Sequence, residues 1–498
     1  MTNTLPLIRA PAPSPVRRIR ALAVVSLAAL LAGCAAVGPN FTPPAPPTAQ
    51  GYAMAGDDPN TGVVQAAVGD QVTAQWWTLF HSPALDQMVR EAIANNRTLA
   101  QARARLAAAH EAVAAQSGLF SADLSAGVQR ERANLNAFSG GAFSSAGALG
   151  FPTNPEFNLY TISPSVSYNV DLFGAKRRKV ESLQAAAESQ ARELDAAYLT
   201  LTGKVVEQAL TVADATLQIR ALEAIGANDQ ADLDMLRRAR AAGGATDAQV
   251  SAAEGMLAQD SAAIPIQRQR LAEARHRLAV LVGKSPMDWA PPDFDETSGS
   301  LPQSLPVSLP SQLVRQRPDI LEAEAQLHEA TAQIGVATAA LYPNITLSAN
   351  IAQNALTPQT MFSQIADSWA FGAGLTTPIF HSGELKAQQR QAQDEARAAL
   401  AAYEETVLEA FNQVDDSLQA IAHDNQAYAE QDAATQAAQA RLEMVRKAFA
   451  AGGASAQDVV RTERDWRRLK LVLSQQGTGR FSDAARLLLA TASVPPQS

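Results

Sequence analysis

The chain has 498 residues and a formal net charge of −9, and 47% of its residues are apolar although only 5% are aromatic. An acidic balance with no basic tract after the first twenty residues argues against a nucleic-acid partner. Ala dominates the apolar share and has too little bulk to fill a thick globular core. The composition therefore predicts extended, closely packed helices in place of several compact domains.

The first 33 residues have the features of a cleaved signal peptide. Four arginines precede an apolar run, Ala21 to Leu31, that is too short to span a membrane. The run ends in Leu-Ala-Gly-Cys, which resembles a bacterial lipobox and implies a covalent lipid on Cys34. Ala35 follows in place of Asp, and the sorting rule for such lipoproteins then implies the outer membrane. The alternative is an ordinary signal peptide with an incidental cysteine.

Cys34 is the only cysteine, so the chain forms no internal disulfide and no cysteine zinc cluster. Apart from the lipid we expect no cofactor and no metal. Residues 34–83 begin with a proline-rich stretch that predicts an extended tether leading away from the lipid. A second polar, proline-rich stretch, residues 286–310, is the predicted linker between two halves of the chain.

Two segments in these halves are nearly the same: MLRRARAAGGATDAQV (Met235–Val250) and MVRKAFAAGGASAQDV (Met444–Val459). Each places an Ala-Gly-Gly-Ala break between two helix-forming stretches, so the chain is predicted to form the same helical hairpin twice. We therefore predict a first structural repeat over residues 84–285 and a second over 311–490, followed by a short tail, 491–498.

Each repeat is predicted to run helix, strand, loop, strand, long helix, returning helix. The opening helices carry apolar residues seven apart. These residues are Leu99, Leu106, Val113 and Phe120 in the first repeat and Ile320, Leu327, Ile334 and Leu341 in the second. The strands are expected over about 121–135, 158–173, 343–356 and 366–380, where apolar residues alternate. The long helices, from Ala175 and from Glu384, reach about 100 Å at 1.5 Å per residue.

Polar residues alternate with the apolar ones in the second strand, and they predict a polar face. They are Thr161, Ser163, Ser165, Ser167, Asn169 and Asp171. Strands of this length cross a bilayer when tilted, with the apolar face toward lipid and the polar face toward a wet lumen. Four strands cannot close, and lipid does not tolerate an open sheet edge, so several protomers must share one barrel. The alternative is a small soluble sheet.

Several motifs in order resemble the outer membrane factor family, specifically its TolC-like OprM/NodT lipoprotein branch. They are CAAVGPNFTPP, QWWTLFHSPALDQMVREAIANN, LYPNITLSA and the paired AGG breaks. The resemblance implies a mainly α fold with a membrane β-barrel. Each protomer supplies four strands to a trimeric, twelve-stranded barrel, which is continuous with a long periplasmic α-helical barrel. Trp76 and Trp77 match an equatorial element of the family, and we expect them to serve packing.

The same resemblance implies the outer membrane channel of a tripartite, RND-type efflux system, which exports drugs or other small molecules. The channel would be a homotrimer that joins a periplasmic adaptor and an inner-membrane pump. It would be lipid-anchored, span the outer membrane and extend into the periplasm. The outer membrane conduit of a type I protein secretion system is the alternative.

The resemblance also implies site residues at the hairpin ends. Asp458 matches an acidic aperture position, and Arg461 stands where the family commonly has a second Asp. Three copies of Asp458 around an opening would repel one another and raise their proton affinity. Arg461 would offset this by pairing with Asp458 or Glu463. The adaptor-contact tips are Ala242, Gly243 and Gly244 in the first repeat and Ala451, Gly452 and Gly453 in the second.

Two other classes of protein fit less well. Gly283-Lys284-Ser285 has the end of a phosphate-binding loop, but the triplet ends a helix where it should begin one, so we do not expect an enzyme. A structural coiled-coil lipoprotein would explain the heptads but not four amphipathic strands in matching places. The sequence does not name the exported compound, the cognate adaptor and pump, or the resting state of the gate.

Overall fold

The computed structural model describes residues 36–48, 51–52, 66–68, 72–118, 120–132, 156–292, 300–302 and 304–494. Cys34 and the predicted signal peptide lie outside these residues. The chain divides into two compact units. Unit 1 comprises Met1–Thr42, His110–Ala185 and His328–Ala398, and unit 2 comprises Pro43–Ala109, Ala186–Leu327 and Ala399–Ser498. Each unit takes segments from both sequence repeats, so the repeats are not separate bodies.

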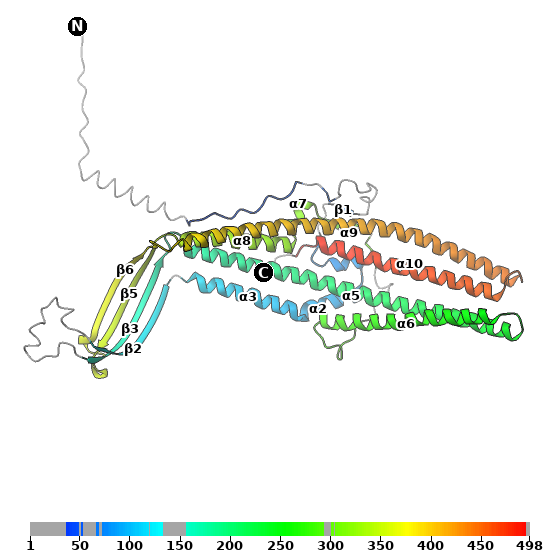
Figure 1. Ribbon diagram of the computed structural model, residues 1–498, viewed down its shortest axis with the longest axis horizontal. Helices are drawn as coiled ribbons and strands as arrows, with labels where there is room; N and C mark the ends of the chain where they lie inside the picture. The colour runs from blue at the N-terminus through cyan, green and yellow to red at the C-terminus, as the bar shows by residue number, and fades with distance from the viewer. Residues whose placement is uncertain are drawn as a thin grey trace, which may run out of the picture. The chain divides into compact units, whose positions relative to one another are not determined.

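The two repeats follow the same order of elements, as the sequence predicts (Figure 1). The first contains α2 (Pro83–Asn95), α3 (Arg97–Ser117), β2 (Phe120–Arg132), β3 (Glu156–Val170), α5 (Ala175–Ala241) and α6 (Asp247–Leu281). The second contains α7 (Pro310–Leu313), α8 (Pro318–Ala339), β5 (Asn344–Ala355), β6 (Asp367–Thr376), α9 (Glu384–Ala450) and α10 (Ala456–Thr491). Helices α5 and α9 have 67 residues each, which gives the expected length of about 100 Å.

Short elements lie between these. β1 (Ala66–Val68) pairs in parallel with β4 (Leu305–Val307), and a 3₁₀ helix, η2 (Trp76–Phe80), precedes α2. Two more 3₁₀ turns, η5 (Pro358–Thr360) and η6 (Gln364–Ala366), connect β5 to β6.

The opening helices end earlier than the heptads predict. Phe120 is the first residue of β2, and Leu341 lies in the turn after α8. Their predicted places on a helical seam are therefore wrong. Gly118 follows the last residue of α3, and Pro343 disfavours helical backbone at the residue before it, so both helices stop one turn short. Pro378 likewise ends β6 before Ile379, because proline cannot donate to a strand ladder.

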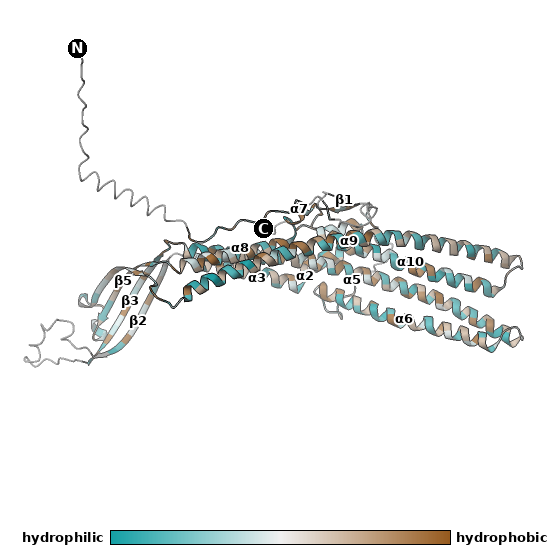
Figure 2. Cartoon of the chain, turned by 45° about the horizontal axis from the view of Figure 1, so that its top comes forward, coloured by the Kyte–Doolittle hydropathy of each residue, from teal (hydrophilic) through white to brown (hydrophobic). Residues whose placement is uncertain are grey.

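Unit 1 contains a four-stranded antiparallel sheet in the order β2-β3-β5-β6 (Figure 1). Its register places Ser121, Ser167, Ser348 and Gly372 across the strands on one face, with the Ser121 and Ser167 hydroxyl oxygens 2.6 Å apart. The alternate positions are apolar, and Leu124, Val128, Trp369 and Phe371 are exposed. In Figure 2, hydrophilic and hydrophobic residues both occur along the strands of this sheet. The sheet thus has the predicted polar and apolar faces.

Asp171 departs from this pattern. β3 ends at Val170, and the Asp171 carboxylate accepts hydrogen bonds from the backbone N–H groups of Lys176 and Arg177 at 3.0 and 2.9 Å. The first turn of a helix has N–H groups without helical partners, and a carboxylate satisfies them. The prediction that Asp171 lines the polar face is therefore wrong, because this residue caps α5.

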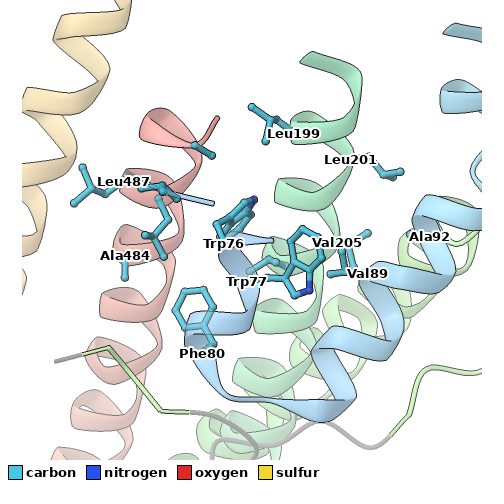
Figure 3. Packing of buried hydrophobic residues seen from close by; sticks show 14 of the residues in the cluster. Trp76, Trp77, Phe80, Val89, Ala92, Leu199, Leu201, Val205, Ala484 and Leu487 are labelled. Carbon is cyan, nitrogen blue, oxygen red and sulfur yellow. The ribbon is translucent and has the colours of Figure 1, made fainter. Parts of the chain in front are cut away.

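Unit 2 has its apolar core around η2. Trp76, Trp77 and Phe80 are buried among side chains of α2, α5 and α10, including Val89 and Leu487 (Figure 3). The Trp76 indole N–H donates to Thr202 Oγ1 at 3.2 Å, and that of Trp77 donates to Asp86 Oδ1 at 3.0 Å. Both tryptophans therefore serve packing, as expected.

No helix in the described part of the chain is both long and apolar enough to cross a membrane.

A buried arginine in unit 1 holds the N-terminal segment. The Arg178 guanidinium donates to the carbonyl oxygens of Val37 and Gly38 at 3.1 and 3.2 Å, and to Asn40 Oδ1 at 2.8 Å. It also pairs with Glu181 at 2.8 Å. The Val37 N–H donates to the Phe173 carbonyl at 3.0 Å. Residues 37–40, predicted as part of a free tether, are therefore docked against the start of α5.

Gly38→Ala tests this docking. Gly38 has a φ of 93°, and a Cβ there would lie 2.5 Å from Gly335 Cα. A left-handed backbone alone costs a non-glycine residue about 1–2 kcal/mol. We expect the Val37 amide to exchange its hydrogen about tenfold faster or more in the variant. Gly51→Ala is the control because its Cβ meets nothing within 4 Å. Unchanged protection of Val37 would contradict the docking.

Candidate functional site

The two hairpin tips close with the same backbone geometry. Gly243 and Gly452 have φ values of 78° and 75°, and both follow the last turn of a 67-residue helix. The N–H of Gly244 donates to the Ala239 carbonyl at 2.8 Å, and that of Gly453 donates to Ala448 at 2.8 Å. These bonds satisfy carbonyls that the end of a helix leaves unpaired. The duplication seen in the sequence therefore extends to the turn itself.

The predicted tip residues are open to solvent. Ala242, Gly243, Gly244, Ala451, Gly452 and Gly453 are all exposed. A Cβ added at Gly243 or Gly452 would meet no atom within 4 Å. Glycine at these two positions therefore supplies the positive φ and leaves a small, bare surface at each tip.

The returning helices begin with a capping box at each tip, but the two boxes differ in charge. In the first, Thr246 and Gln249 exchange hydrogen bonds. In the second, Asp458 Oδ2 accepts from the Ser455 N–H at 2.9 Å and from the Ser455 hydroxyl at 2.6 Å. A carboxylate also interacts favourably with the helix N-terminus. Only the second tip therefore carries an acid at this position.

Asp458 and Arg461 are exposed on the first turns of α10. The hydrogen bonds from the Ser455 hydroxyl and backbone hold the Asp458 pKa below its ordinary range, and the charge of Arg461 adds to this. Within one protomer Asp458 therefore stays ionised at neutral pH. Its expected rise in proton affinity depends on neighbouring copies of the same residue.

Glu463 has other partners than the expected Arg461. Its carboxylate accepts from Arg446 of α9 at 3.1 Å and from Arg467 at 2.6 Å. Burial would raise the Glu463 pKa, but these hydrogen bonds outweigh it and lower the pKa. Glu463 therefore joins α9 to α10 behind the tip within one protomer, and its pairing with Arg461 stays a prediction.

A buried ion cluster connects the two hairpins. Arg464 of α10 lies 2.6 Å from Asp229 of α5 and 2.9 Å from Asp260 of α6, and Arg468 also lies 2.9 Å from Asp260. The side chains of Asp229 and Asp260 are 4% and 12% exposed, which makes their charges dependent on the arginines. Sequence reasoning missed this cluster. The only signal was two arginines four residues apart on one helix face.

Burial and the nearby Asp260 carboxyl raise the pKa of Asp229 to about 6, although Arg464 opposes the shift. Burial acts in the same direction on Asp260, but its hydrogen bonds from Arg464 and Arg468 lower its pKa. Burial thus favours the protonated form of Asp229, whereas the two arginines favour the ionised form of Asp260.

The Gly283-Lys284-Ser285 triplet, which the sequence compares with a phosphate-binding loop, lies at the end of a helix. Gly283 has a φ of 75° and ends α6, with the Lys284 N–H bonded to the Ala279 carbonyl. The triplet is thus a helix C-cap. Among the described residues, no three His, Cys, Asp or Glu side chains lie close enough to hold a metal ion.

Long helical hairpins in duplicate, joined to a sheet with one apolar and one polar face, define a class of membrane channel. The chain belongs to the outer membrane efflux protein family, whose sequence model matches residues 88–284 and 309–491. It is an outer membrane channel for efflux, and its family is one of transport proteins.

Three similar proteins illustrate the relationship. The toluene efflux pump outer membrane protein TtgC of Pseudomonas putida is 30% identical over 410 residues, 80% of each chain. The probable outer membrane lipoprotein SilC of Salmonella typhimurium is 26% identical over 88% of this chain and 91% of its own. The structure of the outer-membrane channel OprN superposes with a TM-score of 0.79 at 24% identity, covering 92% of this chain and 99% of OprN.

Arg464→Met tests the ion cluster. The change leaves two buried carboxyls facing each other, which costs about 3 kcal/mol at pH 8. Without Arg464 the pKa of Asp229 rises further above its unfolded value. An ionised carboxyl with such a raised pKa destabilises the protein, and the protein regains this stability as pH falls through the folded pKa. We expect faster amide exchange near Asp229 at pH 8 and recovery toward pH 5.

Arg268→Gln is the matched control for this measurement. Its pair with Glu223 at 2.8 Å also joins α5 to α6, but both side chains are exposed. Such a pair contributes about 0–1 kcal/mol. An Arg464→Met defect that did not shrink between pH 8 and pH 5 would contradict the role given to Asp229.

Proposed function

We propose that three copies of this chain form one twelve-stranded barrel, which opens into a helical tunnel and exports small molecules. The observation that carries this is the four-stranded sheet. Within the described residues its outer strands, β2 and β6, have a partner on one side only, and its apolar face bears exposed Leu124 and Trp369. Lipid requires these edges to be paired, and further copies of the same sheet supply the partners.

A lipid on Cys34 is part of this proposal. The lipobox is followed at once by the segment that Arg178 holds, and SilC is named as a probable lipoprotein. Cys34 is two residues before Ala36, which is the first residue that the structure describes. Its acyl chains would therefore be attached close to the docked segment. Several acyl chains give stable anchoring where a single chain does not.

We place the gate at the second hairpin. Three copies of Asp458 would surround the aperture, each held by Ser455 and each accompanied by Arg461. The cation next to the carboxylate reduces the repulsion among the copies, so protonation is not needed to keep the aperture closed. Glu463 lies behind this ring and fixes α10 to α9 through Arg446.

Conductance in a planar bilayer tests both the channel and the gate. The reconstituted wild-type protein should conduct ions, whereas a structural scaffold should not. Arg461→Asp adds a second carboxylate ring, whose mutual repulsion raises the pKa of these carboxyl groups, and conductance is compared between pH 4 and pH 7. We therefore expect conductance to change more steeply over this range in the variant. Arg461→Gln is the control, since it removes the cation without adding an acid.

An absence of conductance in the wild-type protein would contradict the channel. An Arg461→Asp variant with an unchanged pH response would contradict the gate while leaving the channel intact.

We place the adaptor contact at the bare tips. Gly453→Ala adds a methyl group that meets only the Ala448 carbonyl at 3.6 Å, an ordinary contact, and requires no positive φ. It should keep the turn and obstruct docking, which weakens adaptor binding about fivefold or more. Gly255→Ala, whose Cβ meets nothing within 4 Å, is the control on α6. The measurement is compound susceptibility of a deletion strain that carries each variant. Full resistance with Gly453→Ala would exclude this contact.

A further inference from the structure

Unit 1 contains a cavity of about 400 Å³ at the base of its sheet. Its lining residues come from three connections between strand and helix: β3 to α5, α8 to β5, and β6 to α9. Figure 1 shows the elements that these connections join. Under the proposed function the helices extend into the periplasm, so this end of the sheet faces the periplasmic surface of the membrane. The cavity therefore lies at the depth of the lipid headgroups.

The polar part of the cavity carries one ammonium group and one imidazole. Lys176 and His381 line it, and the Lys176 ammonium takes no part in any ion pair among the described residues. Asp171 also lines the cavity, but its carboxylate is occupied by the N–H groups of α5 and by the Arg177 side chain. An anion entering here would meet an unpaired ammonium group and a carboxylate already neutralised by its partners.

The remainder of the cavity is aromatic and apolar. The rings of Phe173 and Tyr342 stack with centroids 4.6 Å apart, and both residues line it. Ile379 and Phe380 follow Pro378 at the rim and are 92% and 82% exposed. A part-exposed tyrosine next to exposed apolar side chains is typical of a membrane interface. The site thus offers a cationic pocket next to an apolar surface.

The turn after β6 fixes His381 in place. Ser382 and Gly383 both have positive φ, 46° and 84°, and the Glu384 N–H donates to the His381 carbonyl at 2.9 Å. Positive φ is costly for serine, so this reversal is held by its surroundings. His381 is therefore part of a defined turn beside the cavity.

The chain's own lipid is the nearest competing occupant. Ala36 packs on Gly174, where an added Cβ would lie 2.4 Å from the Ala36 Cβ. Cys34 is two residues away, a reach of about 7 Å at most. A thioether-linked glyceride has no negative charge, however, and does not neutralise Lys176. The charge at the site favours a separate, anionic occupant.

We propose that this cavity binds the headgroup of an anionic phospholipid from the periplasmic leaflet, with Lys176 and His381 facing the phosphate and Ile379 and Phe380 facing the acyl chains. This binding would place a membrane lipid beside the point where the lipidated segment joins the barrel. It depends on the outer membrane location of the chain and not on the exported compound or the gate.

Native mass spectrometry of the full-length protein assembly, with added phosphatidylglycerol or phosphatidylcholine, tests the proposal. The wild-type protein should retain phosphatidylglycerol more tightly, and Lys176→Gln and His381→Gln should each weaken this, about fivefold for the lysine. Lys386→Gln is the matched control. This exposed lysine follows Leu385, which lines the cavity, but does not itself line the cavity. Conductance of each variant confirms an intact channel.

Equal retention of the two lipids, or the same loss with Lys386→Gln as with Lys176→Gln, would overturn the proposal. So would displacement by millimolar inorganic phosphate, which would indicate a free-anion site. Phosphatidylglycerol bound only when Cys34 is replaced by Ser would show that the chain's own lipid fills the cavity. Binding confined to single protomers would show that a neighbouring copy covers it.

Discussion

Backbone hydrogen bonding in hydrocarbon is the constraint on which this architecture depends. An unpaired N–H or C=O in lipid costs several kcal/mol, so a membrane sheet must have no free edge. The described sheet has two, at β2 and β6, although each repeat contributes two strands. Duplication doubles the strands without closing them. Under our proposal further copies of the sheet close it, and the strict alternation along the strands follows from having lipid on one face and water on the other.

The two hairpins show how a duplication diverges without changing its backbone. Both tips use a left-handed glycine and a capping box, because every helix end must satisfy the same N–H and C=O groups. The capping residue differs, Gln249 in one and Asp458 in the other. One amide-to-carboxylate difference therefore gives the second tip a charge that the first lacks. The Arg464 cluster then joins the hairpins by buried ion pairs, so the charge at the tip and the contact between the hairpins depend on different carboxyls.

The base of the sheet has its own charge arrangement. Arg178 is buried by its contacts with Val37, Gly38 and Asn40, and its neighbour Lys176 lines a cavity without an ion-pair partner. Lys176 and Arg178, two basic residues of one short run, thus have different roles. One holds the segment that follows Cys34, and the other is available to a membrane lipid under our proposal. Both place charge near the depth at which the strands leave the bilayer.

The spacing of apolar residues and the positions of glycine and proline predicted most of the fold. A period of two predicted the strands and their faces, seven-residue repeats predicted the helices, and the Gly-Gly breaks predicted the tips, because these features depend on neighbours in sequence. Helix ends were missed at Phe120 and Leu341, where Gly118 and Pro343 outweigh the heptad. The partners of charged groups were decided only by tertiary structure. Asp171 caps a helix, and Glu463 pairs with Arg446, because a charge responds to whatever lies within a few ångströms, however distant in sequence.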